Sequence, residues 1–157
     1  MSSVKDSLIL VNGSRQHPNL ELRQIRGKGR GVFATRPIRK GEILAVMGGR
    51  VLPFEKMMQL PSLLCRLSFH VEYDFYLCPF SLRRIAICFF MNHSCDPNTC
   101  GDEELTLTTI AARRIEAGEE ITCDYKNDFF DKNNRIKPFR TFKCVCGAKK
   151  CRRIVRH

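Results

Sequence analysis

An apolar run ends abruptly in the stretch Met91-Asn92-His93-Ser94-Cys95-Asp96-Pro97-Asn98, which is dense in side chains that form hydrogen bonds. Pro97 stops any helix here, because proline lacks a backbone N–H and clashes with the preceding turn. A single histidine in such a place is more often a structural residue. Asparagine, histidine and cysteine packed together at the edge of an apolar run favour a functional site, so this stretch is the first candidate.

Cysteine spacing gives a second signal. The chain has nine cysteines, and an odd number argues against a closed disulfide framework. Three thiols in Cys144-Val-Cys146-Gly-Ala-Lys-Lys-Cys151 fill three of the four positions of a tetrahedral zinc ion. Cys95 is the best-placed fourth ligand, since its segment ends in an exposed turn, and zinc would then clip the C-terminal tail over Asn92–His93. Unmetallated thiols are the alternative. Three other cysteines lie among apolar residues and are predicted to be small core residues: Cys65, Cys78 and Cys88.

Short alternating segments predict a mainly β fold with one helical insert. Leu20–Ile25 alternates apolar and polar residues and leads into the glycine-rich turn Gly27-Lys-Gly-Arg-Gly31. This turn is neither a dinucleotide fingerprint nor a phosphate loop, but its backbone amides allow close approach of a ligand. The other expected segments are a strand within Ile38–Val46, helical turns over Phe54–Leu67 broken at Pro61, a strand at Tyr73–Cys78, a strand or short helix at Leu82–Met91, strands over Glu104–Ala112 and Glu119–Tyr125, and a loop over Asp128–Pro138.

Composition and charge limit the class of protein. The 157 residues are 43% hydrophobic and 27% charged, which suits one globular domain and excludes fibrous, collagen-like and disordered classes. The net charge of +11 is concentrated: Lys132–His157 has ten basic residues and no acidic one, Arg23–Lys40 has seven and none, and Asp102–Asp131 is acidic by nine to three. This distribution favours a partner approached from one side, such as a nucleic acid, a basic protein tail in a nucleic-acid setting or an anionic surface. A charged face that only aids solubility is the alternative.

No stretch predicts a membrane segment. The longest apolar runs, Leu8–Val11 and Ile85–Met91, are far shorter than the roughly 20 residues of a spanning helix. The run after Lys5 and Asp6 is also too short for the apolar region of a signal peptide. We therefore expect a soluble, intracellular protein, or one exported by a route that the sequence does not show.

Taken in order, four elements between Leu20 and Arg152 resemble the SET-domain protein lysine methyltransferases. Gly27–Val32 is similar to the first S-adenosylmethionine loop of that family. Asn92–Cys95 matches its Asn-His-Ser-Cys signature, and Gly118–Tyr125 resembles its Gly-Glu-Glu-Leu-Thr-Phe-Asp-Tyr strand. Cys144–Cys151 is similar to the post-SET zinc element, whose fourth ligand in the family is the cysteine of the Asn-His-Ser-Cys stretch.

The resemblance implies a mainly β (β+α) class: a SET-domain β-clip fold of short curved sheets, with a C-terminal pseudoknot near Asn92 and a zinc-bound post-SET tail. The implied division is an N-terminal extension (1–19), a SET domain (20–130) and a post-SET zinc-binding tail (131–157). S-adenosyl-L-methionine and Zn²⁺ are the implied cofactors. The implied activity is protein lysine N-methylation, with a histone as the first substrate expected. The implied location is chromatin in the nucleus, and the alternatives are the cytoplasm or delivery into a host cell.

The resemblance also carries residue roles over to this chain. Cofactor-binding positions are Lys28, Gly29, Arg30, Asn92, His93, Tyr125, Phe142 and Val145, the last two covering the adenine ring. Catalytic positions are Tyr125, whose hydroxyl faces the reacting methyl and amine, and His93. Zinc ligands are Cys95, Cys144, Cys146 and Cys151, and the substrate channel and product specificity fall to Cys123 and Tyr76.

Three departures from the family pattern stand out. Val46 lies near the position of the usual aromatic residue in the strand after Gly41, and the Gly-Asn pair and arginine that commonly precede the Asn-His motif are replaced within Ile85–Phe89. Cys123 stands where the family usually has phenylalanine or tyrosine. Because cysteine is smaller and has no phenol to hold a water, we expect methylation beyond the first methyl group.

Alternatives remain for the function. A non-histone protein substrate keeps the enzyme, whereas a non-catalytic SET-like module would bind chromatin or nucleic acid through the basic tail. A small zinc-bound nucleic-acid-binding protein is a third, but it leaves the Asn-His-Ser-Cys stretch without a role. For the enzyme, DNA contact by the basic tail predicts a preference for nucleosomes over free peptides that fades with salt. The acidic stretch Asp102–Asp131 is then the candidate lining of the substrate groove, and the oligomeric state stays open.

Overall fold

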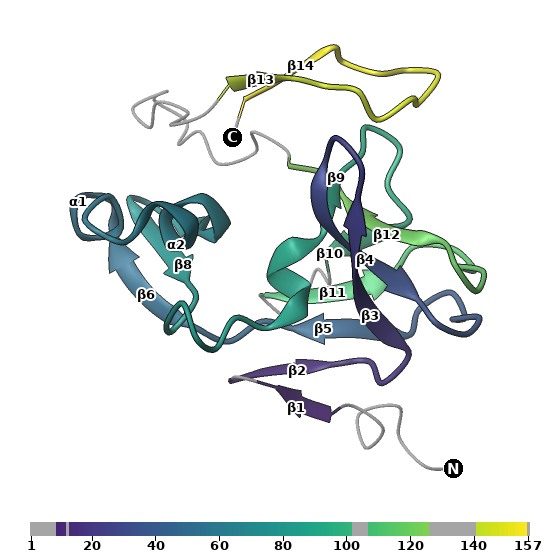
Figure 1. The fold of residues 1–157 in the computed structure, drawn as a ribbon, viewed down its shortest axis with the longest axis horizontal. Helices are drawn as coiled ribbons and strands as arrows, with labels where there is room; N and C mark the ends of the chain where they lie inside the picture. Colours follow the sequence, from purple (N-terminus) through teal and green to yellow (C-terminus); the bar gives the residue numbers. More distant parts are fainter. Residues whose placement is uncertain (1–8, 12, 102–106, 126–140, 157) are drawn as a thin grey trace.

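The computed structural model describes residues 9–11, 13–101, 107–125 and 141–156, so the loop predicted over Asp128–Pro138 lies outside the described residues. The described chain consists mainly of short strands, which confirms the mainly β prediction (Figure 1). The strands are β1 (Ile9–Val11), β2 (Ser14–Gln16), β3 (Leu20–Ile25), β4 (Gly29–Ala34), β5 (Ile43–Val46), β6 (Arg50–Pro53), β7 (Phe69–Glu72), β8 (Phe75–Cys78), β9 (Asn92–His93), β10 (Thr99–Gly101), β11 (Thr108–Ala111), β12 (Glu120–Cys123), β13 (Thr141–Lys143) and β14 (Ile154–Arg156). The helices are α1 (Phe54–Met57), α2 (Ser62–Leu67) and the 3-10 helix η2 (Ile87–Phe90). None of these is long and apolar enough to cross a membrane.

A four-stranded sheet in the order β3-β4-β12-β9 brings two distant motifs together. The predicted hairpin forms between β3 and β4, and its turn contains Gly27 and Gly29 with φ angles of 79° and 84°. Glycine adopts such angles without steric cost, because it has no Cβ atom. β12 pairs with β4 along one edge. Along its other edge β12 is parallel to β9, with Cys123 paired to His93. The glycine-rich turn and the Asn-His motif therefore belong to one sheet.

Gly31 in β4 allows this sheet to close tightly. A Cβ atom at this position would lie 2.5 Å from Ile25 Cδ1, 2.8 Å from Glu120 Oε1 and 2.9 Å from Asn92 Nδ2. The space is instead used by the Asn92 amide, which donates to the Arg30 carbonyl (3.0 Å) and to the Glu120 carboxylate (2.8 Å). The motif on β9 is thus tied to the strand that follows the glycine-rich turn.

The helical insert carries its own small sheet, in the order β6-β8-β7. The helical turns expected over Phe54–Leu67 are confirmed as α1 and α2, with Pro61 preceding the first turn of α2. The strand predicted at Tyr73–Cys78 begins later, at Phe75, because Tyr73 has a φ of 51° in the turn between β7 and β8. A five-stranded sheet, β1-β2-β5-β11-β10, completes the body of the described chain.

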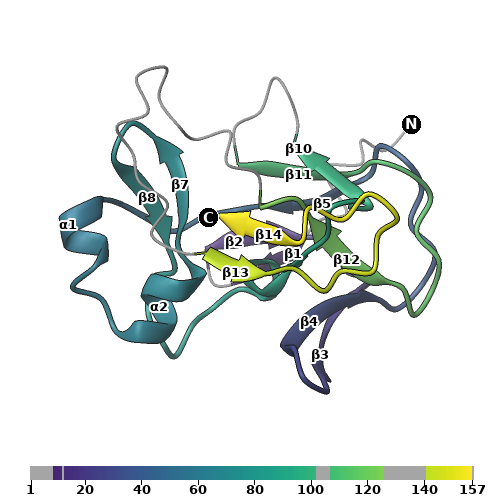
Figure 2. The same cartoon turned by 90° about the horizontal axis from the view of Figure 1, so that it is seen from above.

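Two clusters of apolar side chains form the core. The main cluster lies between the two larger sheets and includes η2, so Leu82–Met91 contains the short-helix alternative rather than a strand. Cys88 is buried in it, Cys78 is buried in a smaller cluster under α1 and α2, and Cys65 is half-buried beside that one. The β13–β14 hairpin lies above β9 and β12 in Figure 1, and Figure 2 places it between the insert and β12.

Candidate active site

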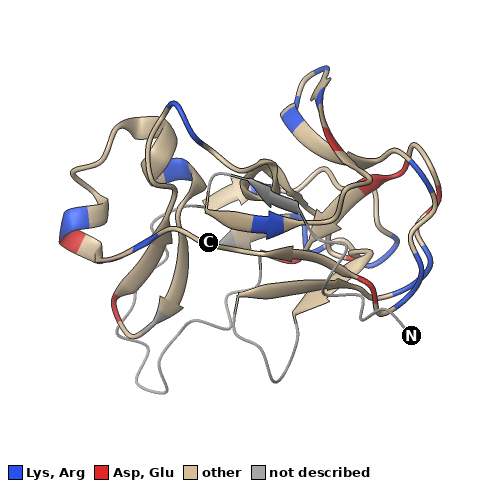
Figure 3. Cartoon of the chain, turned by 90° about the horizontal axis from the view of Figure 1, so that it is seen from below, with Lys and Arg blue, Asp and Glu red and all other residues tan. Residues whose placement is uncertain are grey.

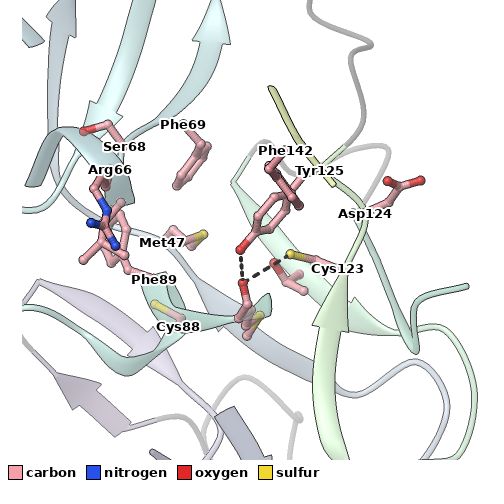
Figure 4. Close-up of a pocket in the computed structure, with 13 residues that line it drawn as sticks. Met47, Arg66, Ser68, Phe69, Cys88, Phe89, Cys123, Asp124, Tyr125 and Phe142 are labelled. Atoms are coloured by element: carbon pink, nitrogen blue, oxygen red, sulfur yellow. Dashed lines mark hydrogen bonds between the residues drawn. The ribbon is translucent and has the colours of Figure 1, made fainter. Parts of the chain in front are cut away.

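Tyr125 follows β12 and lies where three elements meet. Its hydroxyl donates to the Met91 carbonyl at 2.6 Å, and its backbone N–H donates to His93 Nδ1 at 3.0 Å. The Cys123 thiol lies 3.9 Å from the same Met91 oxygen, and both contacts are drawn in Figure 4. Because β9 and β12 are parallel neighbours, Met91 just before β9 and His93 within it both reach Tyr125.

His93 connects Tyr125 to the cysteine region. Its side chain is only 3% exposed, and Nδ1 accepts the Tyr125 N–H, so the ring proton must be on Nε2. Nε2 lies 3.2 Å from Cys95 Sγ and therefore donates to the sulfur. Burial lowers the pKa of His93, and this effect outweighs the opposing influence of Asp124. His93 is thus a neutral link that orients Tyr125.

An apolar pocket of about 250 Å³ opens beside the Tyr125 hydroxyl. Its lining comes from the insert, from η2, from the residue after β5, from β11 and from the C-terminal segments (Figure 4). The lining residues are Met47, Arg66, Leu67, Ser68, Phe69, Cys88, Phe89, Met91, Thr109, Cys123, Asp124, Tyr125 and Phe142. Burial raises the pKa of the Cys123 thiol to about 12, so this wall of the apolar pocket is uncharged at neutral pH.

A basic pocket of about 280 Å³ adjoins the apolar pocket, with which it shares Arg66, Leu67, Phe89 and Tyr125. Its described lining contains three cations and no Asp or Glu. The residues are Gln24, Lys28, Gly29, Arg30, Leu63, Arg66, Leu67, Phe89, Phe90, Asn92 and Tyr125. Arg30 lies over the Phe90 ring, 4.0 Å from its centroid, which fixes one cation on an aromatic wall.

An open groove of about 700 Å³ shares part of its lining with the apolar pocket and none with the basic pocket. It runs between β7 and the strands β10 and β11. The lining residues are Met47, Phe69, His70, Val71, Cys95, Pro97, Thr99, Cys100, Gly101, Leu107, Thr108, Thr109, Cys123 and Asp124. Cys123 and Asp124 belong to both the groove and the apolar pocket, and Tyr125 belongs to both the apolar and the basic pocket. The groove, the apolar pocket and the basic pocket therefore adjoin in this order, and Tyr125 lines the apolar and the basic pocket.

The four-cysteine cluster, Cys95 with Cys144, Cys146 and Cys151, is assembled as the spacing predicted. All four Sγ atoms lie within 4.8 Å of one another, and those of Cys95 and Cys144 are 3.8 Å apart. A tetrahedral zinc ion with Zn–S bonds of about 2.3 Å requires S···S separations of about 3.8 Å. The donor set and its size thus fit a structural zinc site.

Backbone N–H groups also point at these sulfurs. Cys95 N lies 3.4 Å from Cys146 Sγ, and the N–H groups of Arg152 and Arg153 lie 3.4 Å from Cys95 Sγ and Cys151 Sγ. Burial acts against ionisation of Cys146, but hydrogen bonds from the backbone around it and from the Cys144 and Cys151 thiols outweigh burial and lower its pKa to about 6. Burial raises the pKa of the neighbouring Cys144 to about 12. The donors around Cys146 stabilise a thiolate, the form in which cysteine binds zinc.

Most of the cofactor positions that the resemblance named meet at the basic pocket. Lys28, Gly29, Arg30, Asn92 and Tyr125 line it, and Phe142 of β13 lines the apolar pocket next to it. The rings of Phe142 and Tyr125 are 6.2 Å apart. Two of the named positions line none of the three pockets: Val145 is 67% exposed, and the His93 side chain is buried at 3% exposure.

Tyr76 is not brought to the apolar pocket. It is 3% exposed in the small cluster of Met57 and Cys78, with its ring 5.8 Å from that of Phe54. Successive side chains of a strand point to opposite faces, and Tyr76 is on the face of β8 opposite to Leu77, which belongs to the main core. The described residues therefore place Tyr76 under the insert helices rather than in a channel.

Other lining residues were not singled out from the sequence. Met47 lines both the apolar pocket and the groove. It therefore covers the wall for which the family pattern has an aromatic residue near position 46. Phe69 begins a strand, β7, that sequence patterning did not indicate. Arg66 lies in the helical segment Phe54–Leu67, whose apolar spacing suggested only core packing. The basic residue among these apolar positions was the available signal that this segment lines a pocket.

Comparison with known proteins adds the family. The SET domain model matches residues 29–126. Histone-lysine N-methyltransferase 2B of Homo sapiens is 33% identical over 138 residues, covering 81% of this chain and 5% of that protein. Histone-lysine N-methyltransferase Su(var)3-9 of Drosophila pseudoobscura pseudoobscura is 28% identical over 166 residues, covering 93% and 26%. The variant-silencing SET domain-containing protein of Plasmodium falciparum is 28% identical over 148 residues, covering 85% and 5%.

A solved structure agrees on the fold. The crystal structure of Kryptonite in complex with mCHG DNA and SAH superposes with a TM-score of 0.66 at 24% identity, covering 89% of this chain and 29% of that one. The chain spans between 5% and 26% of the length of the curated relatives named above. The mainly β SET-domain fold with a C-terminal cysteine cluster suited to zinc is therefore the observed one. With its family model matched over more than half its length and its fold shared, the chain belongs to the SET domain family.

Proposed function

We propose that this chain transfers a methyl group from S-adenosyl-L-methionine to a lysine side chain of a protein, and that the protein is a histone. The observation that carries the proposal is that Tyr125 lines both a basic pocket and an apolar pocket, and that the apolar pocket shares part of its wall with a groove. Relatives named histone-lysine N-methyltransferases and a similar structure solved with SAH support it.

The basic pocket suits S-adenosyl-L-methionine, which would supply a methyl group on a sulfonium ion. Cations without an opposing Asp or Glu in the described lining favour its carboxylate. The backbone of Lys28, Gly29 and Arg30 is exposed at the hairpin turn, where a ligand can approach closely. Phe90 and Asn92 provide an aromatic wall and an amide for the rest of the molecule.

The apolar pocket suits a lysine that must lose its proton. An unperturbed lysine has a pKa near 10.4 and is protonated at neutral pH, so it cannot attack. An apolar environment and a neighbouring sulfonium cation both lower that pKa, and no dedicated base is then needed. Tyr125, held by Met91 and His93, would orient the amine in line with the methyl group. Alignment and exclusion of water then provide most of the rate.

The test is methyl incorporation from labelled S-adenosyl-L-methionine into core histones and a peptide array. Tyr125→Phe is expected to lower incorporation by about 100-fold, the scale of a lost electrostatic contact to a transition state. Tyr73→Phe is the matched control, because Tyr73 is 71% exposed and outside the three pockets. Incorporation that survives Tyr125→Phe would contradict the role of Tyr125. Calorimetric absence of cofactor binding would favour the non-catalytic chromatin-binding module instead.

Cys123 is proposed to permit more than one methyl group. Its small thiol lies on the wall shared by the apolar pocket and the groove, and it offers no phenol to hold a water against the amine. We expect di- or trimethylated peptide by intact-mass analysis, and a shift to monomethylated product for Cys123→Tyr. Val51→Tyr, at an exposed position on β6 outside the three pockets, is the control for introducing a tyrosine. A single added methyl in both wild type and Cys123→Tyr would refute this assignment.

Zinc is proposed at the four-cysteine cluster, where it would join the segment after β9 to the tail beyond β13. The cluster is linked to Tyr125 through His93 Nε2, and Phe142 of β13 lines the apolar pocket. Metal bound there would therefore hold both the tyrosine and the aromatic cover of the site. One zinc per chain by elemental analysis is the expected result.

Nucleosomes are proposed as the preferred substrate form, and chromatin in the nucleus as the location. The described part of the basic tail has exposed Lys143, Lys149 and Lys150, and Figure 3 shows further cations on several other segments. The predicted acidic lining is represented in the described groove by Asp124, which also pairs with Arg152. Faster methylation of nucleosomes than of a matched peptide, with the difference lost as salt rises, is the expected result. Equal rates at low salt would refute it.

A further inference from the structure

We infer that the basic loop Arg36-Pro-Ile-Arg-Lys40, between β4 and β5, binds the phosphate backbone of duplex DNA, an inference that deepens the proposed function and rests on its nucleosome substrate. The basic loop ends the cation-rich stretch Arg23–Lys40, which contains seven basic residues and no acidic one. Lys28 and Arg30 of that stretch line the basic pocket, whereas residues 36–40 line none of the three pockets. The site of methyl transfer therefore does not account for the charge of the basic loop.

A second loop, between β11 and β12, holds the basic loop in place. Ile38 and Ile115 exchange two backbone hydrogen bonds of 2.9 Å each, and both side chains are completely buried. The Gly41 N–H also donates to the Ala111 carbonyl at 2.8 Å. The ring of Pro37 fixes its φ angle. The backbone of the basic loop is thus already ordered, so little of its conformational freedom is lost when a ligand binds.

The cations of the basic loop have no acidic partner. Arg36, Arg39 and Lys40 are exposed, and none of them forms an ion pair with another described residue. The nearest acid along the chain, Glu42, pairs instead with His17 at 3.3 Å. Three unpaired positive charges on one short loop are neutralised by ions from solution, and a polyanion that releases these ions gains affinity.

An arginine of the second loop lies beside the basic loop. Arg39 follows Ile38 and Arg114 precedes Ile115, so the two arginines are neighbours next to an antiparallel bridge. Arg114 pairs with Glu116 at 2.5 Å, but both side chains are 62% exposed, and exposed pairs are weak in water. The two loops lie at the end of the molecule away from the insert (Figures 1 and 2), and Figure 3 shows Lys and Arg on both. A phosphate at the basic loop can therefore also meet this guanidinium.

Duplex DNA fits this surface better than a peptide does. Surfaces that bind proteins or peptides are centred on apolar or aromatic anchors. None of the large apolar side chains that are exposed in the described part of the chain lies within 35–42 or 112–119. The two loops offer cations without such anchors, which is how proteins hold DNA phosphates without reading the sequence. DNA bound here leaves the three pockets free for cofactor and substrate.

The test is the salt dependence of DNA binding by the full, zinc-loaded chain. Fluorescence anisotropy with a labelled duplex of mixed sequence gives the logarithm of the affinity against the logarithm of the salt concentration. We expect the triple variant Arg36→Ser, Arg39→Ser and Lys40→Ser to reduce the magnitude of this slope by about 3, since each lost phosphate contact removes about 0.9. Its affinity at about 0.1 M salt should fall by about 100-fold.

The matched control is the triple variant Arg50→Ser, Arg83→Ser and Arg84→Ser. It removes the same charge from exposed positions outside the three pockets, and its slope should change by less than about 1. Thermal unfolding verifies that both variants are folded, which substitutions at exposed positions should not disturb.

The outcomes separate this inference from the proposed function. An equal fall in slope for both triple variants would refute the inference, because net charge rather than the basic loop would then decide binding. An unchanged slope for the basic-loop variant, or no DNA binding by wild type at low salt, would refute it as well. Binding of polyglutamate as tightly as DNA would exclude DNA as the preferred ligand. Methylation of a free histone peptide measures the proposed function separately, and both variants should match wild type there. If wild type methylates no histone or peptide but DNA binding depends on the basic loop, the function fails and the DNA contact stands.

Discussion

Asn98 anchors the segment that carries the Asn-His motif, and its replacement by alanine gives the sharpest test of the fold around the site. The side chain is 2% exposed. Its Nδ2 donates to the Glu119 carboxylate at 3.0 Å and to the Glu120 carbonyl at 2.8 Å, while its Oδ1 accepts the Thr122 N–H at 2.9 Å. The Asn98 amide thereby joins the segment after β9 to Glu119, which precedes β12, and to Glu120 and Thr122 within β12.

The magnitude follows from these three bonds. Two neutral bonds contribute about 1 kcal/mol each, and the bond to a carboxylate about 1.5 kcal/mol or more, so Asn98→Ala should lower the free energy of unfolding by about 3–4 kcal/mol. That is a large share of the roughly 5–15 kcal/mol of a typical domain. For a chain of this size the melting temperature should fall by about 10 °C.

The assay is urea unfolding followed by far-ultraviolet circular dichroism on zinc-loaded protein. The control is Asn92→Ala, since Asn92 is half-buried and its amide donates to the Arg30 carbonyl at the basic pocket and to the Glu120 carboxylate. We expect the control to lose about 2 kcal/mol, somewhat less than the sum of its two bonds because both are partly exposed to solvent, and to lose most of its affinity for S-adenosyl-L-homocysteine. Asn98→Ala should lose more stability and keep that affinity in the folded fraction. A loss below about 1 kcal/mol for Asn98→Ala, or a larger loss for the control, would refute the reasoning.

Three further predictions concern the same framework. Removing zinc with a chelator should disorder the tail and abolish cofactor binding while the main sheets persist, as measured by amide hydrogen exchange; protection unchanged in the tail would count against a zinc clip. Gly31→Ala should lower the free energy of unfolding by about 1–3 kcal/mol, because its Cβ would displace the ends of the Ile25, Glu120 and Asn92 side chains, and chemical denaturation would measure it. Burial would raise the pKa of Glu119, but hydrogen bonds from Arg113, the Glu116 N–H and Asn98 outweigh it and lower the pKa to about 2. The stabilisation by Glu119 should therefore be complete above pH 4.5 and vanish as the pH falls to about 2, so the difference in unfolding free energy from Glu119→Gln should shrink over that range; a constant difference would exclude the linkage.

Local chemistry made much of the site readable in the sequence. Glycines that must adopt positive φ marked the β3–β4 hairpin, and thiol spacing marked the three C-terminal members of the four-cysteine cluster. Alternation marked β3 and β12, because one face of each is buried against the core. Strands of three residues or fewer, such as β9 and β10, carry too little pattern to show a period, so they were not indicated.

The positions of side chains that lie between distant segments depend on tertiary packing rather than on the local sequence. Tyr76 and Met47 show the limit: each lies in or next to a predicted strand, but the face that meets the pocket depends on the register of β8 and β5 with their neighbours. Arg66 likewise depends on how α2 is rotated. None of these rotations or registers is fixed by the local residues, because they follow from packing against segments elsewhere in the chain.

The sequence by itself determined the family pattern, the hairpin turn and the likeness of the cysteine cluster to a zinc site, since each depends on residues close together in the chain. Only the tertiary structure decided that Asn92 reaches the Arg30 carbonyl 62 residues away and that Tyr125 lines both the basic pocket and the apolar one. These contacts arise when β12 pairs with β4 on one side and with β9 on the other. That pairing is a property of the whole core, because the burial that stabilises it is shared by all the strands.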